Sequence, residues 1–316
     1  MGTPDFARTA LEALLADNHF DVVAVVTQPD RPAGRKMRST PSSVKTLALQ
    51  KGLTVFSPET VNTVEFRNEV LALAVESAVV VAFGQLLGDE FLSLFPKNAV
   101  NVHGSLLPKW RGAAPIQRSL MAGDQETGVA LQLVVKKLDA GPVLGIRRLK
   151  LTDENKATDV YPILAKLGSE LLMVEYMDYL RGHLAPIEQD ESGVTIAKKI
   201  KKSEAALDWS KSAREILNLT RGLALGPVPF ARRADGAAFK LHTVSIVDEG
   251  RNGIAGTVRA VTDTSFEIQC GYGVVKVVEI QPESRAKMPT KDYLLGYPVK
   301  VGEVLMNGAL PQETFK

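Results

Sequence analysis

Apolar residues in the first 180 positions recur in an order that predicts strands and helices in alternation. Continuous apolar runs rich in β-branched residues are typical of strands in a parallel sheet that is covered on both faces. Such runs lie at residues 21–27, 54–56 and 78–82. The segments between them carry apolar residues at helical spacing and cover residues 6–14, 42–50 and 61–76. This alternation predicts an α/β fold with a doubly wound, Rossmann-like parallel sheet.

The pattern changes after residue 125. Residues 128–135 alternate as a strand, residues 138–142 (LDAGP) read as a turn, and residues 143–151 can pair back as a hairpin partner. A long helical pattern then covers residues 157–181. We therefore expect the first domain to end near residue 182.

The last part of the chain has a different pattern of apolar and polar residues. Residues 183–203 form a basic, linker-like segment, and a helix is expected at residues 213–221. Short alternating segments separated by turn signals then predict a small antiparallel barrel. These segments are residues 239–247, 256–261, 266–270 and 274–280. The expected domains are residues 1–182 and 204–316, joined by the basic linker 183–203.

Composition narrows the class of protein. The chain is 45% hydrophobic and 23% charged with a net charge of +2, which excludes a globally basic nucleic-acid binder but permits a local basic face. The single cysteine, Cys270, excludes an internal disulfide and a Cys-rich zinc site. No signal peptide or membrane span is expected, because charged residues interrupt the opening helix and Glu76 interrupts the most apolar run. A cytoplasmic monomer without a metal is the expectation.

Candidate chemistry gathers in residues 98–117, NAVNVHGSLLPKWRGAAPIQ. Asn101 and His103 end a short apolar strand, where ligands bind in open α/β sheets. Because these residues are two positions apart on a strand, their side chains point to the same face. The asparagine supplies a neutral hydrogen-bond donor, and the histidine supplies a group of a type that titrates near neutral pH. Taken alone, an N-x-H pair also fits a structural histidine. The chain carries neither GxGxxG nor GxxxxGK[ST], so no phosphate-binding loop is predicted.

The complete string resembles the signature NxHxSLLPxxRGxxP of the folate-dependent formyltransferases, with every fixed position filled. The resemblance implies transfer of a formyl group from 10-formyltetrahydrofolate to an amine. Asn101 and His103 match the catalytic N-x-H, and Asp139 matches the aspartate of the family's L/V-D-x-G turn. Asn101 can stabilise the oxyanion and His103 can donate a proton. Asp139 can bind the imidazolium or accept the amine's proton through water; without the N-x-H it would be read as a turn-capping residue.

The same resemblance implies a folate site in two loops. It consists of Ser105, Leu106, Leu107 and Pro108, which match the SLLP segment, and of Phe83, Gly84, Gln85, Leu86 and Leu87, which match the loop around the pterin. Phe83 stands where the family more often has tyrosine. For these loop residues, packing in the core is the alternative interpretation.

Three features of the resemblance favour methionyl initiator tRNA as the formyl acceptor. Residues 27–35 read TQPDRPAGR, like the loop that reaches the acceptor end in family members acting on this tRNA, and a basic linker and an OB-like C-terminal barrel follow. The candidate tRNA-binding residues are Arg31, Arg35, Lys36, Arg38, Lys198, Lys199, Lys201 and Lys202. The chain departs from the family strings RAxNPWP at residues 221–229 and TYAxKI at residues 195–200. A sugar or purine-precursor amine as acceptor, or a non-catalytic RNA-binding protein, are the alternatives.

The chain opens directly on the turn GTPDFA. In the family that it resembles, about half a dozen apolar residues precede this turn and form a central strand. Four buried aliphatic side chains contribute roughly 6–12 kcal/mol, comparable to the whole stability of a domain. The expectation is that the natural product begins upstream of Met1, or that this 316-residue chain has low stability.

Overall fold

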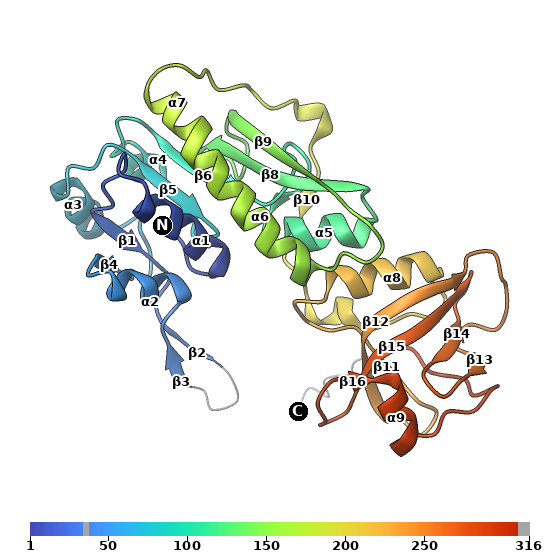
Figure 1. Cartoon of the computed structure of the whole chain (residues 1–316). Coiled ribbons are helices and arrows are strands. Elements are labelled where there is room, and N and C mark those ends of the chain that lie inside the picture. Colours follow the sequence, from blue (N-terminus) through green and yellow to red (C-terminus); the bar gives the residue numbers. More distant parts are fainter. Residues whose placement is uncertain (34–37, 309–316) are drawn as a thin grey trace. The chain divides into compact units, whose positions relative to one another are not determined.

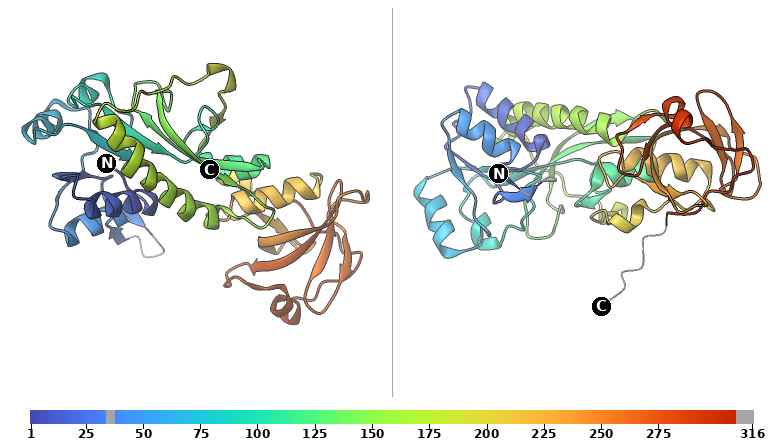
Figure 2. Two further views of the ribbon diagram at one scale, coloured as in Figure 1. Left: turned by 45° about the horizontal axis from the view of Figure 1, so that its top comes forward. Right: turned by 90° about the horizontal axis from the view of Figure 1, so that it is seen from below.

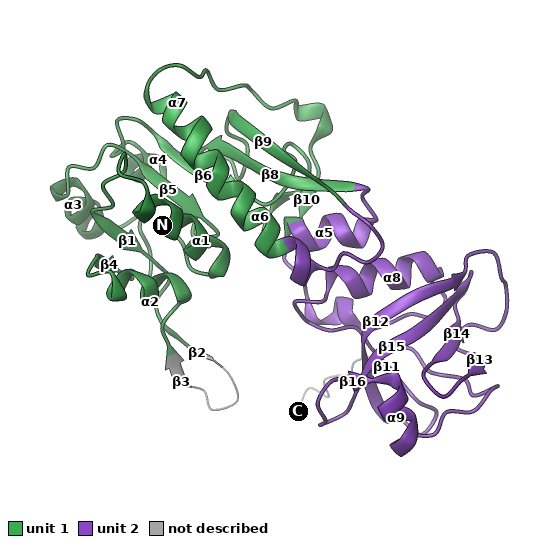
Figure 3. Cartoon of the chain, in the orientation of Figure 1, with its two compact units in different colours: residues 1–115, 126–150, 161–198 green, residues 116–125, 151–160, 199–316 purple. Residues whose placement is uncertain are grey.

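The structure, a computed structural model, describes residues 1–33 and 38–308, and the chain divides into two compact units (Figures 1 and 3). The first unit contains residues 1–115, 126–150 and 161–198. The second contains residues 116–125, 151–160 and those from 199 onward.

The first unit is built on strands that meet the predicted α/β pattern. Strand β1 (Ala24–Val26) pairs in parallel with β4 (Thr54–Phe56). The larger sheet has the order β5 (Ala78–Val81), β6 (Ala99–His103), β8 (Glu126–Leu133) and β9 (Val143–Lys150). Its first pair is parallel and the next two pairs are antiparallel, so the predicted hairpin of β8 and β9 is confirmed and the sheet is mixed.

Helices lie on both faces of these strands (Figure 2). They are α1 (Asp5–Ala16), α2 (Ser43–Gln50), α3 (Val64–Ala72), α4 (Asp89–Leu92), α6 (Ala157–Leu171) and α7 (Met177–Leu180). A π-helical segment, Leu172–Tyr176, joins α6 to α7, so the helix expected over residues 157–181 is confirmed as far as residue 180, with one π turn inside it. Phe66 of α3 stacks on Phe91 of α4, and Phe95 meets Phe91 edge to face. These rings belong to the same buried cluster as Val26 and Val80 of the strands.

The first two residues join the β1–β4 pair to the larger sheet. The Gly2 amide donates to the Val26 carbonyl (2.9 Å), and the Met1 carbonyl accepts from the Val81 amide (2.9 Å). The Met1 amino group donates to the Val79 carbonyl (2.7 Å). Met1 and Gly2 therefore bond to β1 on one side and to β5 on the other.

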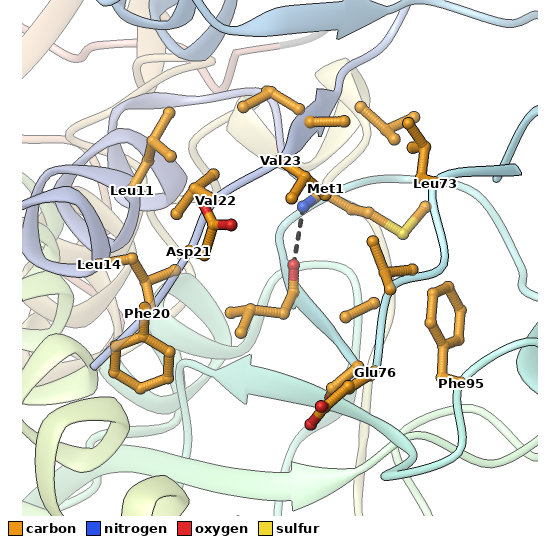
Figure 4. Close-up of a pocket in the computed structure, with 18 of the residues that line it drawn as sticks. Met1, Leu11, Leu14, Phe20, Asp21, Val22, Val23, Leu73, Glu76 and Phe95 are labelled. Atoms are coloured by element: carbon orange, nitrogen blue, oxygen red, sulfur yellow. Dashed lines mark hydrogen bonds between the residues drawn. The ribbon is translucent and has the colours of Figure 1, made fainter. Parts of the chain in front are cut away.

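Beyond Met1 the space between the sheets is a cavity of about 480 Å³ (Figure 4). Leu14 and Phe20 line one side, and Leu73 and Phe95 line the other. Residues of β1 and β5 also line this space. The expectation about residues upstream of Met1 stays a prediction.

The second unit confirms the predicted antiparallel domain. Its sheet has the order β11 (Phe230–Arg232), β12 (Ala238–Asp248), β15 (Val274–Pro282), β14 (Phe266–Gln269) and β13 (Val258–Val261). Helix α8 (Ala213–Gly222) confirms the helix expected at residues 213–221. Two short elements were not expected: β16 (Met288–Pro289) and α9 (Thr290–Gly296). Trp209, Leu207 and Ile216 are buried against the inner face of this sheet. Cys270 is a buried residue of the same core, and burial raises the pKa of its thiol to about 12.

Two segments have more structure than the sequence predicts. The segment between β1 and α2, where the sequence predicts no strand, contains the paired strands β2 (Arg31–Ala33) and β3 (Arg38–Thr40). The segment expected as a basic linker contains β10 (Ile196–Ala197), which pairs with β7 (Arg111–Gly112), and short 3-10 turns at Glu191–Gly193 and Lys202–Ala205. Residues 183–198 therefore belong to the first unit, because backbone pairing fastens them to it. In residues 1–33 and 38–308, no helix is long and apolar enough to cross a membrane.

Stability of the 316-residue chain is expected to depend on pH through the Met1 amino group. Burial lowers the pKa of this amine from 8.0 to about 5. Between these values the unfolded chain binds a proton that the folded chain excludes, so stability rises as the pH increases from 5 to 8. The shift corresponds to about 4 kcal/mol at the upper end. Urea unfolding at pH 5, 6, 7 and 8 measures this gain, and a chain with an acetylated amino terminus should show a much flatter profile. The same slope in both chains would contradict the prediction.

Candidate active site

The N-x-H pair stands at the carboxyl end of β6. The Asn101 and His103 side chains lie on the same face of this strand, next to Gln132 and Ala130 of β8. His103 is 6% exposed, and its Nε2 lies 2.9 Å from the Trp110 carbonyl oxygen. Its Nδ1 lies 3.6 Å from Asp139 Oδ2. Nε2 thus lies at hydrogen-bond distance from an oxygen atom, whereas Nδ1 faces the carboxylate across a longer distance.

Asp139 lies in the turn between β8 and β9, as the sequence predicts, and its carboxylate points back toward β6. Asn101 Nδ2 (3.3 Å) and Gln132 Nε2 (3.2 Å) donate to Oδ1, and the Gly112 amide (2.9 Å) donates to Oδ2. The Asp139 side chain is 10% exposed. Three neutral donors compensate for the lost hydration and leave the carboxylate facing His103.

A second layer of polar side chains backs this turn. Arg111, 2% exposed, donates to Gln189 Oε1 from Nε (3.1 Å) and Nη2 (2.9 Å). Arg111 Nη2 also donates to Glu191 Oε1 (2.8 Å), whose other oxygen accepts from Lys137 Nζ (2.6 Å). Hydrogen bonds from Lys137 and Arg111 lower the pKa of Glu191. The buried guanidinium is therefore compensated by a neutral amide and an exposed carboxylate.

The partner of His103 Nε2 comes from a residue in an unusual backbone conformation. Trp110 has φ +63°, in the left-handed region that non-glycine residues seldom adopt. Its amide donates to Thr195 Oγ1 (2.8 Å), and the next amide, that of Arg111, donates to the Thr195 carbonyl (2.9 Å). Pairing of β7 with β10 continues from there, so residues 195–197 hold the Trp110 carbonyl in place.

The residues expected around folate have mixed environments. Phe83 and Leu87 are buried in the apolar core, whereas Leu86 is 67% exposed. Gln85 uses its side chain to brace a neighbouring loop: Oε1 accepts from the Val61 amide and Nε2 donates to the Pro58 carbonyl.

The SLLP loop is also braced from within. Ser105 is fully buried, and its hydroxyl donates to the Lys109 carbonyl (2.7 Å). Leu107 is buried, whereas Leu106 and Pro108 are partly exposed. Gly84 has φ +86°, which suits glycine at the turn after β5. Several of these side chains therefore pack in the core. If Phe83 or Leu87 contacts a ligand, it does so through its backbone atoms.

The candidate tRNA-binding cations are spread over both units. Arg31 is exposed and pairs with Glu59 (2.8 Å). Arg35 and Lys36 lie outside the described residues, as does the side chain of Arg38. Lys198 is an exposed residue of the first unit, and the others are exposed residues of the second: Lys199, Lys201 and Lys202.

Sequence reasoning missed four residues that contact the site: Gln132, Gln189, Thr195 and the Arg111 side chain. Arg111 belongs to the RG pair of the signature, so the sequence marks it as important without showing its partner. Gln132 occupies an ordinary strand position, and Gln189 and Thr195 lie in the segment predicted as a linker, where nothing in the sequence distinguishes them. In the described parts of the chain, no group of three or more His, Cys, Asp or Glu side chains could hold a metal ion.

Solved structures share this fold. An N-formyltransferase from Helicobacter canadensis, in complex with folinic acid and dTDP-3-aminofucose, matches with a TM-score of 0.65 at 18% identity over 89% of this chain and 97% of its own. WlaRD, a sugar 3N-formyltransferase solved with dTDP and 5-N-formyl-THF, matches with a TM-score of 0.64 at 16% identity over 90% and 97% of the two chains. The fold is thus that of formyltransferases.

Sequence comparison identifies the family. The family described as "Formyl transferase" matches residues 1–175, and "Formyl transferase, C-terminal domain" matches residues 199–298. The chain is 52% identical to a methionyl-tRNA formyltransferase of Bdellovibrio bacteriovorus over 96% of this chain and 97% of that protein. It is 41% identical to the one of Methylococcus capsulatus over 93% and 94%. The chain belongs to the formyl transferase family, and the expected enzyme class is confirmed.

Proposed function

We propose that this protein transfers the formyl group of 10-formyltetrahydrofolate to the α-amino group of methionyl initiator tRNA. The 52% identity to a methionyl-tRNA formyltransferase along nearly the whole of both chains is the observation that carries this proposal. The convergence of Asn101, His103 and Asp139 supports it, because formyl transfer needs an oxyanion stabilised and two protons moved. A protein that catalyses this reaction acts in translation initiation, in the cytoplasm.

Each member of the set has a role that its contacts permit. Asn101 Nδ2 carries two hydrogens; Asp139 takes one, and the other donates to the formyl oxygen as the amine attacks and the C=O electron pair moves to oxygen. As the oxyanion collapses, the C–N bond to the folate breaks and His103 supplies the proton that the leaving nitrogen takes up. Asp139, through a water molecule, accepts the proton that the attacking amine loses.

The two contacts of His103 differ in how readily they can be exchanged. Nε2 lies within hydrogen-bond distance of the Trp110 carbonyl, whereas the 3.6 Å separation between Nδ1 and Asp139 is longer than a direct hydrogen bond. A substrate atom entering between the imidazole and the carboxylate can therefore replace the longer contact. The attacking amine needs no strong base, because an α-amino group has a pKa of about 7.7–8.0.

The folate is assigned to the two loops next to this set. Ser105, Leu106, Leu107 and Pro108 follow His103 after one residue, and residues 83–87 follow β5, the parallel neighbour of β6. Both loops therefore leave the same edge of the sheet as the catalytic set. The two formyltransferase structures that share this fold, solved with folinic acid and with 5-N-formyl-THF, support a folate ligand here.

Replacing the catalytic set is expected to abolish turnover while leaving the fold intact. Asn101→Ala, His103→Ala and Asp139→Ala should each lower kcat by roughly 100- to 10,000-fold, the range typical of removing an acid–base group or an oxyanion donor. The assay follows labelled formyl transfer to charged initiator and elongator methionine tRNAs, with thermal unfolding as the folding control. Full activity of His103→Ala would eliminate the proposed mechanism. Rapid formylation of a sugar or purine-precursor amine, with none of charged tRNA, would replace methionyl-tRNA as the acceptor.

The basic residues are assigned to the tRNA backbone, where cations neutralise phosphates and release counterions. The double variant Arg35→Ala/Lys36→Ala should weaken tRNA binding and flatten its dependence on salt, by a slope of roughly 0.7–0.9 for each phosphate that is no longer neutralised. Filter binding from 50 to 300 mM KCl measures the slope. The matched control, Lys97→Ala/Lys150→Ala, removes two exposed lysines of the same unit and should leave the slope unchanged. Equal slopes for both double variants would refute a tRNA contact at residues 35 and 36.

A further inference from the structure

Residues 187–197, here named the strap, are fastened to the first unit at both ends. At one end Ile187 exchanges backbone hydrogen bonds with Val143 of β9 (2.7 and 2.9 Å). At the other end β10 pairs with β7. The strap thus connects the far side of the Asp139 turn with the backbone next to Trp110.

Gln189 is the residue of the strap that contacts the Asp139 turn. Its Nε2 lies within donor distance of the Asp139 carbonyl (3.0 Å), the Gly141 carbonyl (2.7 Å) and Gln132 Oε1 (3.1 Å). Two of these acceptors are backbone carbonyls on either side of residue 140, so the side-chain amide of Gln189 bridges the two sides of the turn. Gln132 in turn donates to the Asp139 carboxylate (3.2 Å), which links Gln189 to both ends of that residue.

The orientation of the Gln189 amide is determined by charge. Arg111 has only donors, so the two hydrogen bonds from its guanidinium require the oxygen of the amide on that side. The Gln189 NH2 group must then face the turn. A side chain with an oxygen in place of this NH2 group would keep the Arg111 hydrogen bonds and have no donor for the turn.

Restraint of this kind matters because Asp139 has φ +49°. A non-glycine residue in the left-handed region is strained by roughly 1 kcal/mol or more, and it persists only where the surroundings hold it. The strap holds the other acceptor of His103 as well, since Thr195 accepts from the Trp110 amide (2.8 Å). Trp110 has φ +63°, so both partners of the imidazole sit on strained backbone that the strap contacts.

We propose that Gln189 is a positioning residue for formyl transfer, holding the Asp139 turn so that the carboxylate faces His103. Gln189 contacts neither His103 nor the reacting atoms, and acts through Asp139. The activity part of this inference rests on the proposed function, whereas the effect on the imidazole is a property of the protein without substrates.

Within residues 1–33 and 38–308, the charged and polar groups around the pair have these places. His103 faces Asp139 and the Trp110 carbonyl. The Asp139 carboxylate faces the neutral donors Asn101, Gln132 and the Gly112 amide. Beyond Gln189 lie the charges of Arg111, Glu191 and Lys137. Removing the Gln189 donors therefore changes the electrostatics of His103 mainly through the position of Asp139.

Gln189→Ala and Gln189→Glu test the inference, with Glu188→Ala as the control. Gln189→Glu keeps an acceptor for Arg111 and gains an ion pair with it, so the fold should be retained even if Gln189→Ala is unstable. Glu188 is an exposed neighbour on the strap. The chain has only four histidines, so the His103 signal can be assigned by NMR using His103→Ala and followed against pH. Asp139→Asn gives the reference in which the carboxylate is neutralised.

Both Gln189 variants should lower kcat by about 10- to 100-fold, with KM for both substrates within about threefold of the wild type. In both, the NMR signals of the His103 ring should depart from those of the wild type, because the carboxylate that faces the ring at 3.6 Å is displaced. Glu188→Ala should match the wild type in every measurement.

Wild-type His103 ring signals in Gln189→Glu would overturn the positioning role, whatever the activity. So would a fall in activity that tracks a fall in thermal stability while the ring signals stay unchanged. If the wild-type protein transfers no formyl group to charged tRNA but the ring signals change as expected, the proposed function fails and the positioning role stands.

Discussion

A buried carboxylate is the constraint on which the site depends. Asp139 is 10% exposed and lies 3.6 Å from His103, so its charge is unfavourable unless donors replace the lost water. Side chains of β6 and β8 and one backbone amide of β7 supply these donors, and a fourth element, the strap, holds the turn that carries it. Segments from four places in the chain are thereby brought to one edge of the sheet, where a group-transfer reaction needs its donors.

This arrangement requires backbone strain at the site. Asp139 and Trp110 both adopt positive φ, and each provides one of the two acceptors around His103. A strained backbone conformation persists only where several contacts hold it in place. Here hydrogen bonds from Gln189 hold the Asp139 turn, and the hydrogen bond to Thr195 holds Trp110. A site made in this way has little freedom to adjust, which favours preorganisation for the transition state over adaptation to the substrate.

The sequence predicted those parts of the molecule that follow from local pattern. Apolar runs located the strands that carry the site, and a signature string and a short turn pointed to Asn101, His103 and Asp139. It failed where the deciding contact joins distant residues: Gln132 lies 57 positions before Gln189, and no local rule connects two polar side chains at that separation. The strap resembled a linker because its polarity is typical of one, whereas its order comes from pairing with β7 and β9.

The polar side chains behind the site form an alternating series that explains why a buried arginine is tolerated there. From the surface inward, Lys137 pairs with Glu191, Glu191 with Arg111, and Arg111 with the oxygen of Gln189. The neutral amide then presents its hydrogens to the turn, so the Arg111 guanidinium is not placed directly against the Asp139 carboxylate. A direct ion pair would neutralise that carboxylate as a partner for His103, since an arginine competes strongly for it. The Gln189 amide therefore fixes the orientation of the turn without adding a charge next to it. The Asp139 carboxylate then keeps its interaction with the His103 imidazole.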